Sequence, residues 1–476
     1  MNFKKIGAKI RNFFKPTNKV GFGYDAAQTT DANREHWRGA DSLTPDQMNN
    51  PLTRAILRSR ARYEFNNNPW LFGLVKQIAE DIVGTGARLQ IENEDVSFAT
   101  TIVNDFTDWA AEVKLTKMLL NVKKAVARDG ESFVLLTTRQ RNKSKVKLFP
   151  LIFSCDRVSS PIGQNSPEDN NIDGVIIDDC QVPIKYQISK QNPNVAAISK
   201  WETVSADYII HYFDQEYPEQ HRGVPEYTPC LNDIALLRRY TKATLDKMEN
   251  ASNISGVFEP TEALESQIEN TDDFAQKPFK KFVLPSRSFV FSPLGYRLKQ
   301  YELGNPNDSQ QSFALNVKID CARCVLATRN VVTGDSSNYN YASGRLDFQS
   351  YFRAIQNIRA DMEKEILNRI FIMWYAEYSA GMERRETPAF SWYWDGFAHV
   401  DPMKESKSEQ LDMENGTRTL IDVCAEHGLN WKKQVDNRLT VEKYEREQRE
   451  KLGLPQRNTA AENQQTDNGA SDNGEN

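Results

Sequence analysis

The sequence has no long apolar run, few cysteines and no marked excess of charge of either sign. A membrane-spanning helix needs about 20 consecutive apolar residues, and charged residues interrupt every apolar stretch of this chain well before that length. The six cysteines are scattered and follow no secretory hydrophobic segment, so we expect free thiols in a reducing cytoplasm rather than a disulfide framework. These absences exclude a small disulfide-bonded secreted domain and predict a soluble chain without a membrane partner.

The charges nearly balance, with 60 Lys and Arg against 65 Asp and Glu and a formal net charge of -5. Domains that bind nucleic acid tightly by neutralising phosphates are usually clearly basic, so this balance argues against such a domain. The length of 476 residues and a hydrophobic content of 39% predict two to four packed units. The first 62 residues, with twelve Lys or Arg and five Asp or Glu, are basic by comparison.

Catalytic and metal-binding motifs are also missing. The five histidines fall singly in separate segments, and the chain has no nucleophile elbow, Walker loop or metalloprotease His pair. Cys321 and Cys324 have the spacing of a redox or metal motif, but both lie on the apolar face of a predicted helix and zinc needs about four ligands. We expect buried thiols there, a core role for His211, and no catalytic, cofactor-binding or metal-binding residue.

Residues 1–50 are predicted to form an N-terminal extended arm. Residues 16–50 are rich in Asp, Asn, Thr and Gly without periodicity. Before them, Phe3, Ile6 and Ile10 repeat at helical spacing opposite a basic face. A helix that docks on another protein or simply lies at the surface is favoured, and a membrane-surface or targeting helix is the alternative.

Hydrophobic spacing from residue 51 onward predicts mainly helices around one β region. The pattern indicates two helices between 51 and 82, a third over 95–127, and a small, mainly antiparallel sheet over 130–215. Later helices are expected at 344–375, 402–428 and 439–452. The tail from residue 456, rich in Asn, Asp, Gly and Gln, is predicted to be disordered.

Two further helices, near 226–252 and 308–329, flank a second β patch. Between them, the apolar runs at 281–284 and 288–291 flank Pro285-Ser-Arg287 and indicate a hairpin. A helix of 20 residues is about 30 Å long, so this segment predicts a protrusion of two helices with a small β tip. Such a protrusion cannot cover its own apolar faces, and neighbouring copies would have to cover them.

The segment from Asn330 to Gly344 is polar, carries one charge, Asp335, and lies between two strongly predicted helices. An ordinary surface loop and a functional loop are both consistent with this composition.

A series of short motifs, in one order from about residue 24 to 455, resembles the lambda-like bacteriophage portal protein family, the head-tail connector portals. The matching residues are Arg58-Ser-Arg-Ala-Arg62, Asn67-Asn-Pro69, 83–90, Ala127-Arg-Asp-Gly-Glu131, 206–211, 220–224 with Pro229 and Leu231, 338–345, Trp392, Trp394, 401–405, Gly416-Thr417 and 426–431. Each motif is short, and the order of the set makes the resemblance specific.

The resemblance implies an α+β, mainly α fold with wing, stem, clip and crown regions. The implied regions are the arm (1–50), the wing (51–225), stem helix 1 (226–252), the clip (253–307), stem helix 2 (308–329), the tunnel loop (330–344), a wing helix and following segment (345–400), the crown (401–455) and the tail (456–476). In this family a ring of subunits, a dodecamer in the virion, occupies one capsid vertex. Double-stranded DNA enters through its channel during genome packaging and leaves through it during ejection.

The resemblance also implies partners and contact residues. The partners are other copies of the chain, the terminase large subunit, the major capsid and scaffold proteins, the head-completion or connector proteins, and double-stranded DNA that passes without sequence-specific binding. The DNA-channel residues would be Thr333, Asp335, Ser336, Ser337, Asn338, Tyr339, Asn340 and Tyr341, and the clip contacts Lys280, Lys281 and Arg287. The protein would not be an enzyme and would act in the virion after assembly in the host cytoplasm. The alternatives are another multisubunit structural virion protein and a nucleic-acid-processing enzyme.

Overall fold

The structure, a computed structural model, describes most of the chain between residues 30 and 455. The described residues are 30–31, 33–92, 95–140, 145–161, 170–190, 200–253, 257–260, 296–299, 308–335, 341–382, 386–396, 402–427, 429 and 431–455. The chain divides into two units, Met1–Met48 and Asn49–Asn476. In the described part of the first unit, hydrogen-bonded turns precede the short helix α2 (Pro45–Met48).

Two Asn-Pro steps start the first long helices of the second unit. Helix α3 (Pro51–Asn67) follows Asn50, and helix α4 (Pro69–Val83) follows Asn68. Each Asn side chain accepts backbone N–H bonds of the first turn, and each Pro occupies a position that has no N–H bond to lose. Gly84, at φ +52°, ends α4. The two helices expected between 51 and 82 are confirmed.

The single helix expected over 95–127 is instead two helices, α5 (Val96–Val113) and α6 (Leu115–Asp129). Lys114 has φ +57°, in the left-handed region, and separates them. Val113 and Leu115 on either side are both buried, so the turn directs both side chains into the core. Apolar periodicity alone did not reveal this break, because it continues through residue 114.

The β region contains two antiparallel sheets rather than the one that was expected. One has the order β3-β2-β8 and the other β4-β5-β6-β7. Their bounds are β2 Glu131–Thr138, β3 Leu148–Phe153, β8 Ile209–Phe213, β4 Asn171–Ile172, β5 Val175–Ile177, β6 Pro183–Lys190 and β7 Lys200–Ser205. Strand β2 contributes to two hydrophobic clusters, because successive side chains of a strand point to opposite faces of the sheet. Val134 and Leu136 pack in the main cluster, and Phe133 packs in the second one.

A further strand pair joins residues about 300 positions apart. Strand β1 (Arg88–Glu92) pairs antiparallel with β11 (Ala389–Tyr393), so that Leu89 lies opposite Trp392. The sequence analysis did not predict this pairing. It brings the motif at 83–90 next to Trp392 and Trp394, two of the features that carry the family resemblance.

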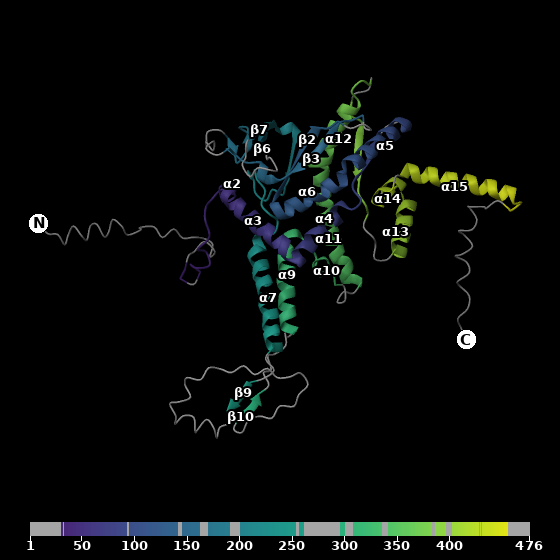
Figure 1. Cartoon of the computed structure of the whole chain (residues 1–476). Coiled ribbons are helices and arrows are strands. Elements are labelled where there is room, and N and C mark those ends of the chain that lie inside the picture. The colour runs from purple at the N-terminus through teal and green to yellow at the C-terminus, as the bar shows by residue number, and fades with distance from the viewer. Residues whose placement is uncertain are drawn as a thin grey trace, which may run out of the picture. The chain divides into compact units, whose positions relative to one another are not determined.

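Helices α7 (Leu231–Asn253) and α9 (Asp308–Ala322) lie side by side and lead to the strand pair β9 (Val257–Pro260) and β10 (Tyr296–Lys299) (Figure 1). The second helix was expected to continue to 329. It ends at Ala322, because a 3-10 turn over Arg323–Val325 and Leu326 at φ +54° interrupt it. The hairpin expected at 281–291 lies outside the described residues.

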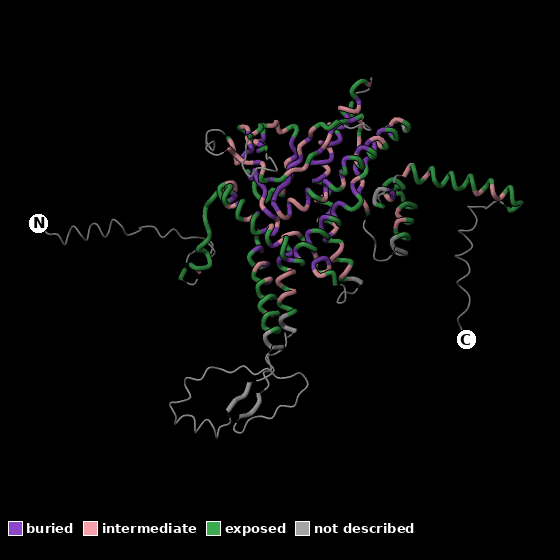
Figure 2. Tube along the Cα trace, in the orientation of Figure 1, coloured by how far each residue is buried: buried purple, intermediate pink, exposed green. Residues whose placement is uncertain are grey.

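The long helix expected at 344–375 is confirmed, with one irregular segment. Helix α11 (Tyr341–Met362) continues through a π-helical turn (Glu363–Leu367) into α12 (Asn368–Tyr378). Its inner face includes the fully buried Met362, Ile366 and Ile370, and Figure 2 shows buried positions concentrated in this part of the second unit.

The C-terminal helices are α13 (Pro402–Glu414), α14 (Leu420–Glu426) and α15 (Trp431–Lys451). The helix expected over 402–428 is therefore two, separated near Gly416 at φ +72°, and the helix expected over 439–452 begins earlier, at Trp431. Among the described residues, no helix is both long and apolar enough to cross a bilayer. The α+β, mainly helical fold class is confirmed.

Candidate functional site

The family motifs meet around one buried carboxylate. Arg58, His211 and Arg222 come from three separate motifs, and all three side chains contact Glu131 at the start of β2. The Arg222 guanidinium lies 2.6 Å from Glu131 Oε1, and His211 Nε2 lies 3.0 Å from Oε2. The backbone N–H of Gly223 also donates to Oε2, at 2.9 Å. Sequence reasoning missed this cluster, although an acidic residue at the head of an apolar strand was a visible signal.

Neighbouring ion pairs extend the cluster toward the surface. Arg62 donates to Asp129 at 2.6 Å and lies 2.8 Å from Asp156, and Arg54 pairs with Asp173. A side chain at residue 223 would not fit, because its Cβ would lie 2.1 Å from the Gly130 carbonyl oxygen. The Gly residues of two motifs therefore allow two backbone segments to touch beside Glu131.

The arginines control the protonation of this centre. Burial alone would raise the pKa of Glu131, but Arg222, the hydrogen bond from His211 and Arg58 hold it well below its usual range. Burial lowers the pKa of His211 despite the attraction of Glu131, so this histidine is neutral at pH 7. Its imidazole also stacks on Phe133, with 4.2 Å between ring centroids. The core role expected for His211 is confirmed, and the cluster joins α3, the loop at 222 and both sheets.

The polar segment expected to be a loop over 330–344 is helical at both ends, because α10 extends to Thr333 and α11 begins at Tyr341. The part before the loop is anchored to the core. Helix α10 (Arg329–Thr333) buries Val331 and Val332, and the Trp70 indole of α4 donates to the Val332 carbonyl oxygen at 3.1 Å. Gly334, at φ +64°, ends this helix, and its N–H donates to Asn330 O at 2.7 Å. The Thr333 hydroxyl then accepts the Asp335 N–H at 3.1 Å.

Helix α11, which follows the loop, is attached to the same helix, α4, from Tyr351 onward. On α11, the Tyr351 hydroxyl donates to the Asp81 carboxylate at 2.9 Å. Arg359 donates to the carbonyl oxygens of Asp81 and Ile82, at 3.1 and 2.7 Å, and so satisfies free acceptors at the end of α4. The helices before and after the loop, α10 and α11, are therefore both attached to α4.

Only part of the predicted channel-loop set falls in the described chain. Thr333 and Asp335 lie at the base of the loop, as above. Ser336, Ser337, Asn338, Tyr339 and Asn340 lie outside the described residues, as does the side chain of Tyr341, whose backbone starts α11. The clip residues Lys280, Lys281 and Arg287 also lie outside them.

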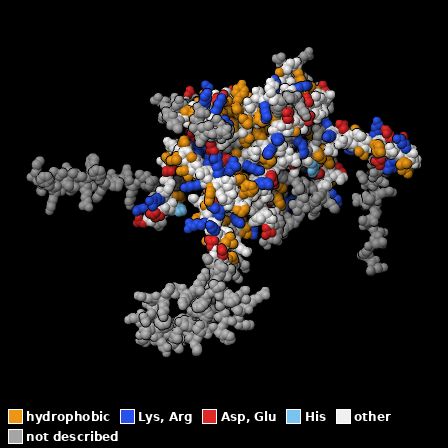
Figure 3. All heavy atoms as spheres, in the orientation of Figure 1, with side chains coloured by type: hydrophobic (Ala, Val, Ile, Leu, Met, Phe, Trp, Pro, Cys, Tyr) orange, Lys and Arg blue, Asp and Glu red, His pale blue; other side chains and the backbone are white. Residues whose placement is uncertain are grey.

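The antiparallel helices α7 and α9 expose apolar side chains that the described part of the chain does not cover. The apolar face of α7 is buried only near its start, at Leu231, Ile234 and Leu237, whereas Leu245 further along is 60% exposed. Leu236, on the opposite side of the helix from Leu245, is 58% exposed. Tyr240 of α7 contacts Phe313 of α9 edge to face, with 6.1 Å between ring centroids, and both side chains stay exposed. Figure 3 shows hydrophobic side chains at the surface of this helix pair.

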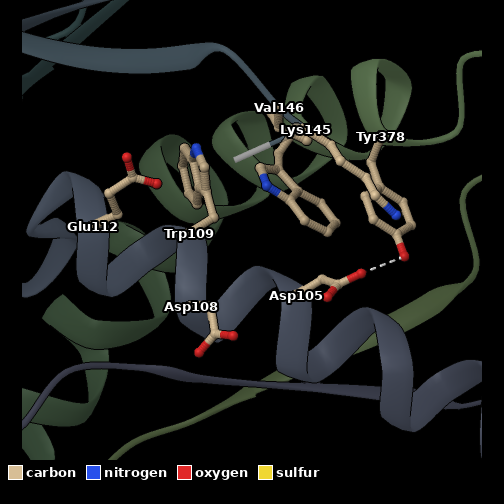
Figure 4. A pocket seen from close by; sticks show the side chains of 8 residues that line it. Asp105, Asp108, Trp109, Glu112, Lys145, Val146 and Tyr378 are labelled. Atoms are coloured by element: carbon tan, nitrogen blue, oxygen red, sulfur yellow. Dashed lines mark hydrogen bonds between the residues drawn. The ribbon is translucent and has the colours of Figure 1, made fainter. Parts of the chain in front are cut away.

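A pocket of about 390 Å³ lies over the aromatic core between α5 and α12. Figure 4 shows that Asp105, Asp108 and Glu112 project from one helix beside Trp109. The Tyr378 hydroxyl donates to Asp105 at 2.7 Å, and burial raises the pKa of Tyr378 to about 12. This contact ties α12 to α5.

The thiols at 321 and 324 lie where α9 ends. Cys321 is buried, as expected, and Cys324 is half-buried against the main core. Among the described residues, no group of three or more His, Cys, Asp or Glu side chains is arranged to hold a metal ion.

Comparison with known proteins gives one family match and several similar structures. The family model "Phage portal protein, lambda family" matches residues 31–359, and a search of curated proteins finds no match. The chain is similar to a chain of "Neck of empty GTA particle computed with C6 symmetry", at 15% identity and TM-score 0.42, covering 78% of this chain and 93% of that one.

Two further similar chains come from gene transfer agent particles. For "Virion of native gene transfer agent (GTA) particle" the identity is 14% and the TM-score 0.40, and for "Neck of native GTA particle computed with C12 symmetry" they are 13% and 0.41. Each match covers 84% of this chain and 99% of the other. The family model spans more than half of the sequence and includes the motifs that meet at Glu131, so the chain belongs to the lambda family of phage portal proteins.

Proposed function

We propose that this protein forms a closed ring at one capsid vertex, through which double-stranded DNA is packaged and later ejected. The observation that carries the proposal is the pair α7 and α9, whose apolar side chains are exposed beyond the first turns. Isolated helices gain most of their stability from covering an apolar face, and one repeated head-to-tail contact closes into a ring. We assign α7 and α9 to the stem and the segment between them to the clip.

The polar segment 330–344, whose central part lies between α10 and α11, is proposed to line the channel. Helix α10 before this loop and helix α11 after it both contact α4, so forces on the loop would pass through these helices into the packed core. Each neutralised phosphate adds affinity and salt dependence, and a strongly basic collar would hold a moving duplex. A loop of Asn, Ser and Tyr with one acidic residue offers hydrogen bonds and steric restraint without that attraction.

Deleting residues 335–341 is expected to leave ring assembly intact and to impair DNA packaging or retention. The reason is that the anchoring contacts of Val332, Tyr351 and Arg359 lie outside the deletion. Nuclease-protected DNA per particle measures packaging and retention, and negative-stain images measure assembly. A seven-residue deletion in the tail, 462–468, is the matched control and should retain both. Normal packaging with full retention in the loop variant would refute the channel role.

The remaining parts of the proposal concern partners and location. We propose that the clip, with Lys280, Lys281 and Arg287, contacts the terminase large subunit during packaging and head-completion or connector proteins afterwards. The ring would be a dodecamer in the virion, would assemble in the host cytoplasm with capsid and scaffold proteins, and would bind DNA without sequence preference. No catalytic step, cofactor or membrane is part of this function.

A further inference from the structure

Three cysteines meet at the root of the two-helix protrusion. Cys230 immediately precedes α7, while Cys321 and Cys324 lie at the end of α9. The Cys230 thiol donates to the Cys321 carbonyl oxygen at 3.5 Å. Its Sγ atom lies 3.7 Å from Sγ of Cys324, although 94 positions separate the two residues. The thiols therefore connect the beginning of one helix with the end of the other.

The pair Cys230 and Cys324 combines proximity with access. Both thiols are free, and Cys230 is buried whereas Cys324 is only half-buried, so a small reagent reaches Cys324 first. A disulfide needs a sulfur separation of about 2.05 Å, so the two sulfur atoms must move closer from their separation of 3.7 Å before the bond forms. By contrast, Cys180 is exposed and Cys155 is buried in the other apolar cluster.

We propose that Cys230 and Cys324 form an oxidative modification site that closes into an intramolecular disulfide. The oxidant is a small disulfide of the glutathione class. The Cys324 thiolate attacks one sulfur of glutathione disulfide, forms a mixed disulfide and releases one glutathione thiolate. Cys230 then loses its proton to solvent, and its sulfur attacks Cys324 Sγ, forms the new bond and releases the second glutathione. The hydrogen bond with Cys321 and burial raise the pKa of Cys230 well above its usual value, so this second step is the slower one and speeds up as pH rises. The two protein thiols lose two protons and two electrons, and the oxidant is reduced to two glutathione molecules.

The disulfide would fix the root of the protrusion. It would close a loop that contains α7, α9 and the whole segment between them, so the two helices could no longer separate or slide at their base. If α7 and α9 are the stem, an inference that rests on the proposed function, then the bond would form once the particle leaves a reducing compartment. The chemistry at the thiols does not depend on that role.

The test is oxidation of the full-length protein with glutathione disulfide, followed by alkylation of free thiols and digestion with trypsin. Cleavage after Arg222, Lys318 and Arg323 places the three cysteines on separate peptides, 223–238, 319–323 and 324–329. Mass spectrometry should find 223–238 joined to 324–329 as the dominant cross-link, with the intact monomer 2 Da lighter after oxidation.

Two serine variants test which cysteine pairs with Cys230. Cys324→Ser should lose the cross-link, and Cys321→Ser should keep it. Deuterium exchange at the start of α7 and the end of α9 should slow on oxidation in the wild type and in Cys321→Ser only. A cross-link from 223–238 to 319–323 alone, a bond through Cys180 between chains alone, or no cross-linked peptide would each overturn the proposal. Ring images of the same samples report separately on the proposed function.

Discussion

Replacing Glu131 by Gln is expected to lower the free energy of unfolding by about 3–5 kcal/mol, the cost typical of removing one partner from a buried ion pair. Glu131 and Arg222 have fully buried side chains, and Arg58 is nearly so. The amide keeps the shape of the carboxylate but removes the counter-charge that Arg222 and Arg58 share in a low-dielectric interior. Arg222 then keeps only Asp173 as a charged partner and Arg58 only Asp156, at the longer distances of 3.3 and 3.8 Å. Urea denaturation followed by tryptophan fluorescence measures the change.

Glu202→Gln is the matched control for this variant. Glu202 forms an ion pair with Lys190 at 2.8 Å on the neighbouring sheet, but both side chains are more than half exposed. Exposed pairs contribute about 0–1 kcal/mol, so this variant should be almost as stable as the wild type. Equal, small effects of both substitutions would contradict the structural role assigned to Glu131.

The pH dependence of stability in the wild type and in Glu131→Gln follows from the direction of each pKa shift. The folded-state pKa of Glu131 lies below its ordinary value of 4.5, so its contribution is present above that value and is lost as pH falls. The folded-state pKa of His211 lies below 6.5. As pH falls, His211 is therefore protonated at a higher pH in the unfolded chain than in the folded chain. The free energy of unfolding consequently also decreases below about pH 6.5. The wild type should lose stability from pH 6.5 downward, with a shallower loss below 4.5 in Glu131→Gln.

Replacing Leu236 and Leu245 together by Asp is expected to abolish ring formation while the single chain stays folded. The two leucines are 58% and 60% exposed, so the folded chain loses little. Burial of a leucine side chain contributes about 1.5–3 kcal/mol, and covering two carboxylates adds a desolvation cost. We expect each subunit contact to weaken at least about 100-fold. Sedimentation velocity measures the assembly state, and circular dichroism checks the fold.

Val182→Asp is the control for the stem variant. Val182 is similarly exposed, at 54%, but lies in the turn before β6, away from α7 and α9. It should form rings as the wild type does. Rings in the Leu236 and Leu245 variant would show that these side chains do not lie at the subunit contact.

Local signals in the sequence predicted much of the helical framework. Asn50-Pro51 and Asn68-Pro69 combine a capping side chain with a residue suited to the first turn, so both helix starts could be read directly. Hydrophobic spacing also predicted the long helix through Trp374 and the exposed apolar face of α7. These features depend on neighbours within a few residues, which is the range over which such patterns are informative.

Features that depend on distant contacts could not be predicted in the same way. Lys114 adopts a left-handed conformation because Val113 and Leu115 both pack inward, and nothing in the local sequence marks that choice. The pairing of Leu89 with Trp392 requires knowledge of two strands about 300 residues apart. The meeting of Arg58, Glu131 and Arg222 likewise depends on the tertiary fold, although the family resemblance had already singled out all three motifs.

We propose that this chain assembles into a closed ring with a channel for DNA. Negative-stain electron microscopy of the purified full-length protein tests it most directly. We expect rings with a central opening wide enough for duplex DNA, built from one repeated contact between stem helices. A monodisperse monomer at high concentration, with no rings in the images, would contradict it.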